Sequence, residues 1–192
     1  MKKQRLEAFS DGVLAIILTI MVLELHAPDG TSLAALRPML PSLAGYALSF
    51  VYIGIYWNNH HHMIQAAERV NGAILWANLH LLFWLSLVPL ATAWLGRQGL
   101  SPWPVALYGT VLFLAGTAYY LLARLLATHH GPESTLAKAL GTDLKGRISL
   151  VVYAAAIALA FVKPALACAL YGSVALMWLY PDARFEKALS RA

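Results

Sequence analysis

Apolar residues dominate this chain in six long runs, which end at charged, proline or glycine residues. The runs cover residues 6–25, 41–62, 70–95, 103–127, 145–162 and 164–180. A helix that rises 1.5 Å per residue needs about 20 residues to cross a hydrocarbon core of about 30 Å. The pattern therefore predicts an all-α integral membrane protein with six transmembrane helices per subunit.

The connections between the runs are short, which predicts a single membrane domain over residues 1–192. Composition agrees, because 60% of the residues are apolar and 12% are charged, against about 45–50% and about 25% in soluble domains. Lys163 and Pro164 alone separate the last two runs. These two runs are expected to form a tight hairpin, or one of them is re-entrant.

Basic residues give an independent test of the six runs, because every second connection of a multi-pass protein lies on the same side. Only Arg37, Arg97 and Lys163 fall on one side. The other side receives Lys2, Lys3, Arg5, Arg69, Arg124, Lys138, Lys145, Arg147, Arg184, Lys187 and Arg191. Positive charge concentrates on the cytoplasmic side of membrane proteins, so both termini are predicted to be cytoplasmic and the protein to lie in the plasma (inner) membrane.

Several other classes of protein fit the sequence poorly. The net charge of +5 does not form a basic stripe, which argues against a nucleic-acid partner. The one cysteine, Cys168, lies in an apolar run and offers neither a disulfide nor a thiolate metal site. Glu7 and Asp11 interrupt the first run and no small-residue cleavage pattern follows it, which disfavours a cleaved signal peptide. No cofactor is expected.

The first run carries the most information. Only twelve uncharged residues separate Asp11 from Glu24, too few to cross the membrane alone, so the helix of about residues 6–25 includes its polar neighbours. At 100° per residue one stripe of this helix holds Gly12, Ile16, Thr19, Ile20 and Leu23. Asp11 lies nearly opposite, toward the other helices. Taken alone, such a stripe is also compatible with ordinary helix packing or lipid contact.

The sequence of this helix resembles the signature first helix of the lysosomal potassium channel family (transmembrane protein 175-like) in its bacterial form. The motif is Arg-x-x-x-Phe-Ser-Asp within a twenty-residue match. The matching residues are Arg5, Phe9, Ser10, Asp11, Gly12, Ile16, Thr19, Leu23 and Glu24. The resemblance also extends to the span number and to the histidine-rich end of the second run.

The resemblance implies a homotetramer in which the first helices surround a central pore for potassium ions. Ile16 would form the pore constriction, with Ile20 and Leu23 lining the pore beyond it, and Thr19 would contribute to selectivity. Glu24 could concentrate cations at the pore mouth, or it could be a solvated helix end. No Thr-Val-Gly-Tyr-Gly filter sequence occurs, which agrees with a family that lacks a carbonyl filter.

Polar residues elsewhere predict a network behind the pore helix, because polar groups in a membrane face protein or water. The network is expected to hold Asp11 through Arg5 and a histidine. Its predicted members are Arg5, Ser10, Asp11, His60, His61, Asn78 and His80. Metal binding by residues 60–62 is disfavoured, because successive helical positions point 100° apart.

Two other functions remain open at this stage. A small proton- or cation-coupled secondary transporter or a membrane sensor would use Asp11 and the histidines to carry protons, although paired broken helices and internal repeats are not evident. An intramembrane enzyme would need a catalytic set within the spans, and none is recognisable. The sequence therefore favours a channel, with no enzyme activity.

Overall fold

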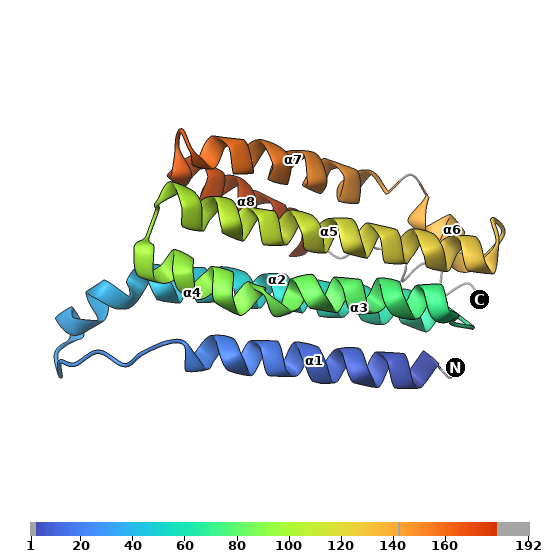
Figure 1. Ribbon diagram of the computed structural model, residues 1–192, viewed down its shortest axis with the longest axis horizontal. Helices are drawn as coiled ribbons and strands as arrows, with labels where there is room; N and C mark the ends of the chain where they lie inside the picture. The colour runs from blue at the N-terminus through green and yellow to red at the C-terminus, as the bar shows by residue number, and fades with distance from the viewer. Residues whose placement is uncertain (1–2, 142, 180–192) are drawn as a thin grey trace.

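The computed structural model describes residues 3–141 and 143–179, and this part of the chain is helical. The elements are α1 (Lys3–Leu23), the 3-10 helix η1 (Leu33–Met39), α2 (Leu40–Ala66), α3 (Gly72–Ser86), α4 (Val88–Gln98), α5 (Pro102–His130), α6 (Thr135–Leu140), α7 (Leu144–Ala160) and α8 (Pro164–Leu179). The long helices lie side by side along one direction (Figure 1). The all-α prediction is confirmed for these residues.

Helix α1 occupies one edge of the bundle (Figure 1). It packs against α2, α3 and α4, whereas α5 packs against α3, α4 and α7. Helices α7 and α8 form a hairpin that contacts α5 and α2. The hairpin turns at Lys163, whose N–H donates to the Leu159 carbonyl over 2.8 Å. One of the two predicted arrangements of these runs, the tight hairpin, is therefore observed.

Four of the described helical stretches are long and apolar enough to cross a membrane. They are Lys3–Leu23, Leu33–Ala66, Gly72–Gln98 and Pro102–His130. Helix α8 is apolar but has 16 described residues, and α7 has 17. Helix α7 is therefore at the short end of the range of about 17–25 residues for a spanning helix.

The third predicted run is not one continuous helix. It divides into α3 and α4 at Leu87, two residues before Pro89. Proline has no N–H to donate to the carbonyl four residues earlier, and its ring clashes with that carbonyl. The chain therefore breaks inside residues 70–95, a feature that the apolar pattern did not predict.

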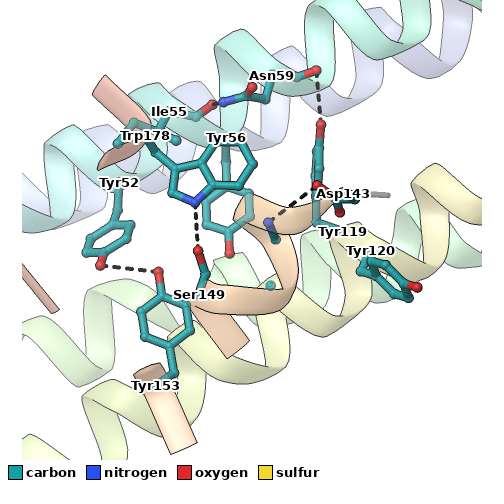
Figure 2. Close-up of a pocket in the computed structure, with 12 residues that line it drawn as sticks. Tyr52, Ile55, Tyr56, Asn59, Tyr119, Tyr120, Asp143, Ser149, Tyr153 and Trp178 are labelled. Atoms are coloured by element: carbon teal, nitrogen blue, oxygen red, sulfur yellow. Dashed lines mark hydrogen bonds between the residues drawn. The ribbon is translucent and has the colours of Figure 1, made fainter. Parts of the chain in front are cut away.

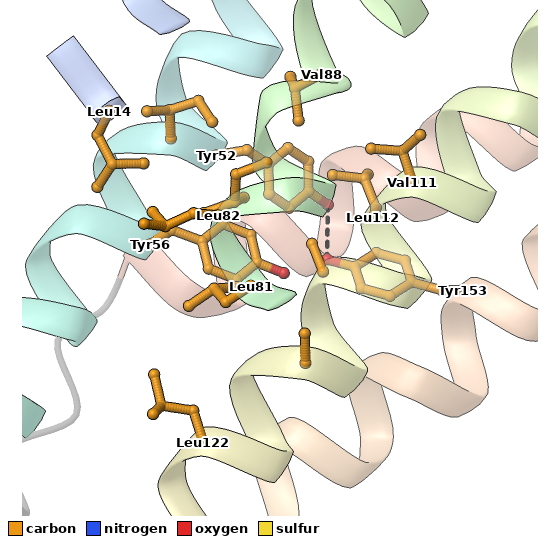
Figure 3. Packing of buried hydrophobic residues seen from close by; sticks show 14 of the residues in the cluster. Leu14, Tyr52, Tyr56, Leu81, Leu82, Val88, Val111, Leu112, Leu122 and Tyr153 are labelled. Atoms are coloured by element: carbon orange, nitrogen blue, oxygen red, sulfur yellow. Dashed lines mark hydrogen bonds between the residues drawn. The ribbon is translucent and has the colours of Figure 1, made fainter. Parts of the chain in front are cut away.

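Buried apolar residues of α1, α2, α3, α4, α5, α7 and α8 form the core, part of which is drawn in Figure 3. Leu112, Leu122 and Ile53 are completely buried. Tyr52 and Tyr153 also lie in this core, and the Tyr153 hydroxyl donates to the Tyr52 hydroxyl over 3.2 Å. Gly109 allows α5 to approach Tyr171, because a Cβ atom at this position would overlap the tyrosine ring.

The connections alternate between two ends of the bundle, as the charge pattern predicts. The start of α1, the α2–α3 connection and α6 lie at one end, and η1, the α4–α5 connection and the α7–α8 turn lie at the other (Figure 1). A hydrogen bond confirms that the start of α1 lies at the same end as the α2–α3 connection, because Lys3 Nζ donates to the Ala67 carbonyl over 2.8 Å. Of the eleven basic residues assigned to that end, Lys2, Arg184, Lys187 and Arg191 lie outside the described residues.

Candidate pore helix and its polar support

Helix α1 has two opposite faces. The face that packs on the bundle consists of the buried residues Leu6, Ser10, Leu14, Ile17 and Met21. Their spacing of three and four residues is that of one side of a helix. Within the single chain the other face is uncovered, and it carries the predicted stripe Gly12, Ile16, Thr19, Ile20 and Leu23.

The uncovered stripe is aliphatic except at Thr19. The exposed fractions are 59% for Ile16, 43% for Ile20 and 78% for Leu23. The Thr19 hydroxyl donates to the Ile16 carbonyl over 2.8 Å, so its hydrogen is engaged within α1. A hydroxyl oxygen keeps two lone pairs for acceptance, and Thr19 can therefore present an oxygen to a cation.

Behind this stripe, three buried side chains from three helices form a hydrogen-bonded chain. Ser10 of α1 accepts from Asn78 Nδ2 over 3.0 Å, and Asn78 Oδ1 of α3 accepts from His60 Nε2 of α2 over 2.7 Å. Ser10 also donates to the Leu6 carbonyl over 2.9 Å. All three residues are at most 2% exposed. This chain ties α1 to α3 and α2 and includes three of the predicted network residues.

The hydrogen bonds also set the protonation of His60. Since Asn78 directs its NH₂ to Ser10, its oxygen faces His60, so Nε2 carries the hydrogen. Within the described residues His60 Nδ1 is buried and has no hydrogen-bond partner. Neutral His60 is therefore the form that this site accommodates, because an unpartnered buried N–H on a charged ring would be costly.

Asp11 lies beside this chain in a second, more exposed cluster. Trp57 Nε1 donates to Asp11 Oδ1 over 3.1 Å. One turn away, His61 Nδ1 lies 2.8 Å from Glu7 Oε1. The Trp57 and His61 rings stack with centroids 6.0 Å apart. Two acidic residues four positions apart on α1 thus face two aromatic residues four positions apart on α2.

The partners in this second cluster differ from the predicted ones. Asp11 contacts Trp57, rather than Arg5 or a histidine. Arg5 is exposed, and across residues 3–141 and 143–179 its side chain makes no hydrogen bond or ion pair. His80 is also apart from the network, because its Nε2 accepts from Trp84 Nε1 of the same helix over 2.9 Å.

Glu24 lies just after α1, at the end of that helix opposite Lys3. Its Oε2 accepts from Arg97 of α4 over 2.8 Å. The side chains remain 42% exposed for Glu24 and 61% exposed for Arg97. The arginine pairs with the carboxylate that the resemblance assigned to a pore mouth, and the pair joins the end of α1 to α4.

Sequence reasoning missed Glu7, Trp57 and Arg97 as partners. Glu7 and Asp11 are four positions apart, as are Trp57 and His61, and this spacing places each pair on one helix face. The spacing was available in the sequence. It could not identify Arg97, because that contact joins residues 73 positions apart.

A separate cavity of about 40 Å³ lies away from α1, between α2, α5, α7 and α8 (Figure 2). Tyr56, Tyr119 and Tyr153 are among its aromatic walls. Trp178 Nε1 donates to Ser149 Oγ over 2.8 Å on one side. A cavity of this size can hold one or a few water molecules. No group of three or more histidine, cysteine, aspartate and glutamate side chains in the described part of the chain is arranged to hold a metal ion.

Several known proteins are similar to this chain in sequence and in fold. The family model for the endosomal/lysosomal potassium channel TMEM175 matches residues 5–89. The chain is 53% identical over 189 residues to a potassium channel of Chryseobacterium sp. (strain P1-3), covering 98% of both proteins. It is 34% identical over 185 residues to a potassium channel of Streptomyces collinus (strain DSM 40733 / Tue 365), covering 91% of this chain and 90% of the relative.

A solved structure agrees with these sequence relationships. The crystal structure of a lysosomal potassium-selective channel TMEM175 homolog from Chamaesiphon minutus is similar to this fold with a TM-score of 0.82. The two chains are 26% identical, and the similarity covers 94% of this chain and 97% of that one. The similarity therefore extends over nearly the whole bundle, including the helices beyond the family-model match.

Proposed function

The chain belongs to the family of the endosomal/lysosomal potassium channel TMEM175, and from this premise we propose that it is a potassium-permeable channel with α1 lining the pore. Four copies would surround a central axis. The observation that supports this assignment best is the uncovered stripe of α1, in which Thr19 interrupts an aliphatic surface. The family consists of ion channels, and the chain is accordingly not an enzyme.

In this proposal Ile16, Ile20 and Leu23 from four copies form a narrow apolar collar. Water is unstable in a sufficiently narrow apolar constriction, so the collar blocks ions by dewetting until the helices move apart. Thr19 places a ring of oxygens beside Ile16 and Ile20. Hydroxyl oxygens can replace part of the hydration shell of an ion, with less discrimination between potassium and sodium than stacked backbone carbonyls provide.

The polar groups behind α1 serve as support in this mechanism. Ser10, Asn78 and His60 hold α1 to two neighbouring helices, and Asp11 adds a contact to Trp57. A displacement of α2 or α3 would therefore be transmitted to the collar. Glu24 has a smaller role at the mouth than its charge suggests, because Arg97 pairs with it.

The proposed topology has six spans and both termini in the cytoplasm, within the plasma membrane. The alternating connections and the concentration of basic residues at the α2–α3 end support this orientation. Helices α7 and α8 would be the fifth and sixth spans. Local thinning of the bilayer can accommodate a helix as short as α7 at modest cost.

The test is potassium flux into liposomes that contain the purified protein. With a potassium gradient and a voltage-sensitive dye, we expect electrogenic flux that scales with the amount of tetramer measured by light scattering. The control is protein-free liposomes with added valinomycin, which checks that the gradient is intact. A monodisperse, folded oligomer that conducts no potassium would refute the proposal.

A further inference from the structure

The C-terminal end of α5 binds the connection between α2 and α3 through His130. The imidazole Nε2 accepts from the backbone N–H of Glu68 over 3.0 Å and from that of Arg69 over 3.2 Å. The other ring nitrogen, Nδ1, lies 2.8 Å from the Leu126 carbonyl. One side chain thus joins two segments that are about 60 positions apart in the sequence.

These three contacts define the charge state that the structure requires. Nδ1 faces a carbonyl, which can only accept, so Nδ1 carries a hydrogen. Nε2 faces two N–H donors, so it must present a lone pair. Only the neutral ring with its hydrogen on Nδ1 satisfies both conditions. A proton on Nε2 would point at two other donors, and both contacts to the connection would be lost.

We propose that His130 is a proton-sensitive latch that holds the α2–α3 connection to α5 when neutral and releases it when protonated. Histidine is the side chain whose charge normally changes between about pH 5 and pH 8. Protonation of His130 on acidification would therefore weaken the attachment. The positive-inside orientation places the latch on the cytoplasmic side, so the sensed pH is that of the cytoplasm.

The α2–α3 connection, which His130 holds, continues into α3, and α3 supports the proposed pore helix α1. Asn71 ends the connection and caps α3, because its Oδ1 accepts from the Ile74 N–H over 3.0 Å. Asn78 lies seven residues further along, which is about 10 Å of helix, and it donates to Ser10 of α1. Loosening residues 67–71 therefore loosens the end of the helix that holds α1.

The segments that meet at this latch, which are α1, the α2–α3 connection and the end of α5, also carry charged and titratable groups. Lys3 of α1 binds the Gln65 and Ala67 carbonyls, and His129 Nδ1 lies 3.3 Å from Asn71 Nδ2. The charged residues of the connection, together with those within six positions of His130 in the sequence, are Glu68, Arg69, Arg124 and Glu133. A hydrogen bond from Lys138 lowers the pKa of Glu133, so Glu133 stays charged between pH 5 and pH 8 and does not supply the pH response.

The effect on conduction rests on the proposed function. Aliphatic side chains of four α1 helices attract one another across a narrow pore, so the collar closes unless the surrounding helices hold it apart. With the latch released, α3 restrains α1 less. We therefore expect acidification to reduce potassium flux by about two- to fivefold, the factor that corresponds to losing one or two weak hydrogen bonds.

The direct test is residue-resolved hydrogen exchange of the full-length oligomer in nanodiscs at about pH 8 and pH 5.5, corrected for intrinsic rates. In the unmodified protein, we expect protection of the Glu68 and Arg69 amides to fall about two- to fivefold at the lower pH. H130Q should abolish this change, because a glutamine oxygen accepts from the same N–H groups and does not titrate. H26Q is the control and should retain the pH dependence, because His26 bonds to the Glu24 carbonyl after α1, away from this connection.

Equal loss of protection in H130Q and in the unmodified protein would overturn the latch. So would a simultaneous loss in the core of α5 around Leu112, which would indicate general unfolding. Flux is then measured with the same pH on both sides of the liposome, so that the orientation of the protein does not matter. A His130-dependent exchange change without potassium flux at any pH would retain the latch and reject the channel.

Discussion

The two faces of α1 differ in which residues they carry and in whether the rest of the bundle covers them. The face against the bundle includes Ser10, whose hydroxyl is buried and hydrogen-bonded. The opposite face is aliphatic and uncovered, with Thr19 as its polar residue within the stripe. In water an uncovered aliphatic face would indicate a missing partner, but in a membrane lipid can cover it without cost. The polar residue is therefore the informative one on each face.

The comparison assigns different consequences to changes on the two faces. Polar groups on the packed face are expected to determine assembly and stability, because a buried polar atom that loses its partner is costly. Residues of the uncovered stripe are expected to determine conduction with little effect on stability. Substitutions that remove one chemical group at a time can separate these effects.

The largest effect on stability is expected for N78L. Leucine cannot bond to Ser10 or His60, so the buried His60 Nε2–H is left unsatisfied, at about 1–3 kcal/mol, whereas Ser10 keeps its bond to the Leu6 carbonyl. Thermal unfolding of the oligomer in detergent, followed by size-exclusion chromatography, measures the loss. Q98L exchanges an amide for the same side chain at an exposed position and should melt like the unmodified protein. Equal melting of N78L and Q98L would show that the buried chain adds no stability.

For the uncovered stripe, I16N should change conduction and leave assembly intact. An amide in the collar binds water and removes the dry constriction, so basal potassium flux should rise several-fold and sodium should permeate more readily. Flux assays with potassium and sodium gradients measure both changes. Val22 is also exposed on α1 but lies about 120° from Ile16 around the helix, which makes V22N the control. Unchanged flux and selectivity in I16N would exclude Ile16 from the pore.

A smaller effect is expected for D11A, which lies between the two faces. It removes one exposed hydrogen bond to Trp57, so stability should fall by about 0.5–1.5 kcal/mol. Recovery of the folded oligomer from detergent should decrease, and the potassium-to-sodium ratio of the remaining oligomers should stay the same. D11N keeps an acceptor for the Trp57 N–H and should recover most of the stability. An intact D11A tetramer with altered selectivity would place Asp11 in the ion path.

The smallest structural change is T19V, which replaces one hydroxyl by a methyl group of similar size. Its hydrogen bond to Ile16 is local to α1, so thermal stability should change by less than about 0.5 kcal/mol. Selectivity for potassium over sodium should decrease, because the collar loses its oxygen ring. T128V removes another threonine hydroxyl that bonds only within its own helix, at the exposed end of α5, and should preserve selectivity. If T19V and T128V select potassium over sodium equally well, the oxygen of Thr19 has no function in permeation.

Much of this arrangement could be predicted from the order of residues. The six apolar runs correspond to the long helices, and the helical period separated Ile16 and Leu23 from Ser10 correctly. The division of residues 70–95 at Leu87 was missed, although Pro89 was visible. Proline alone does not decide such a break, because neighbouring helices can stabilise a continuous, kinked helix in a membrane.

The sequence by itself determined the class of protein, the alternation of the connections and the side of α1 on which the stripe residues lie. These properties depend on the hydrophobic thickness of the membrane and on 100° of rotation per residue, which are local constraints. Only the tertiary structure decided that Asn78 bridges Ser10 and His60, that Trp57 binds Asp11 and that Arg97 pairs with Glu24. Helical periodicity states where a side chain points, but the packing of the other helices determines which group it meets there.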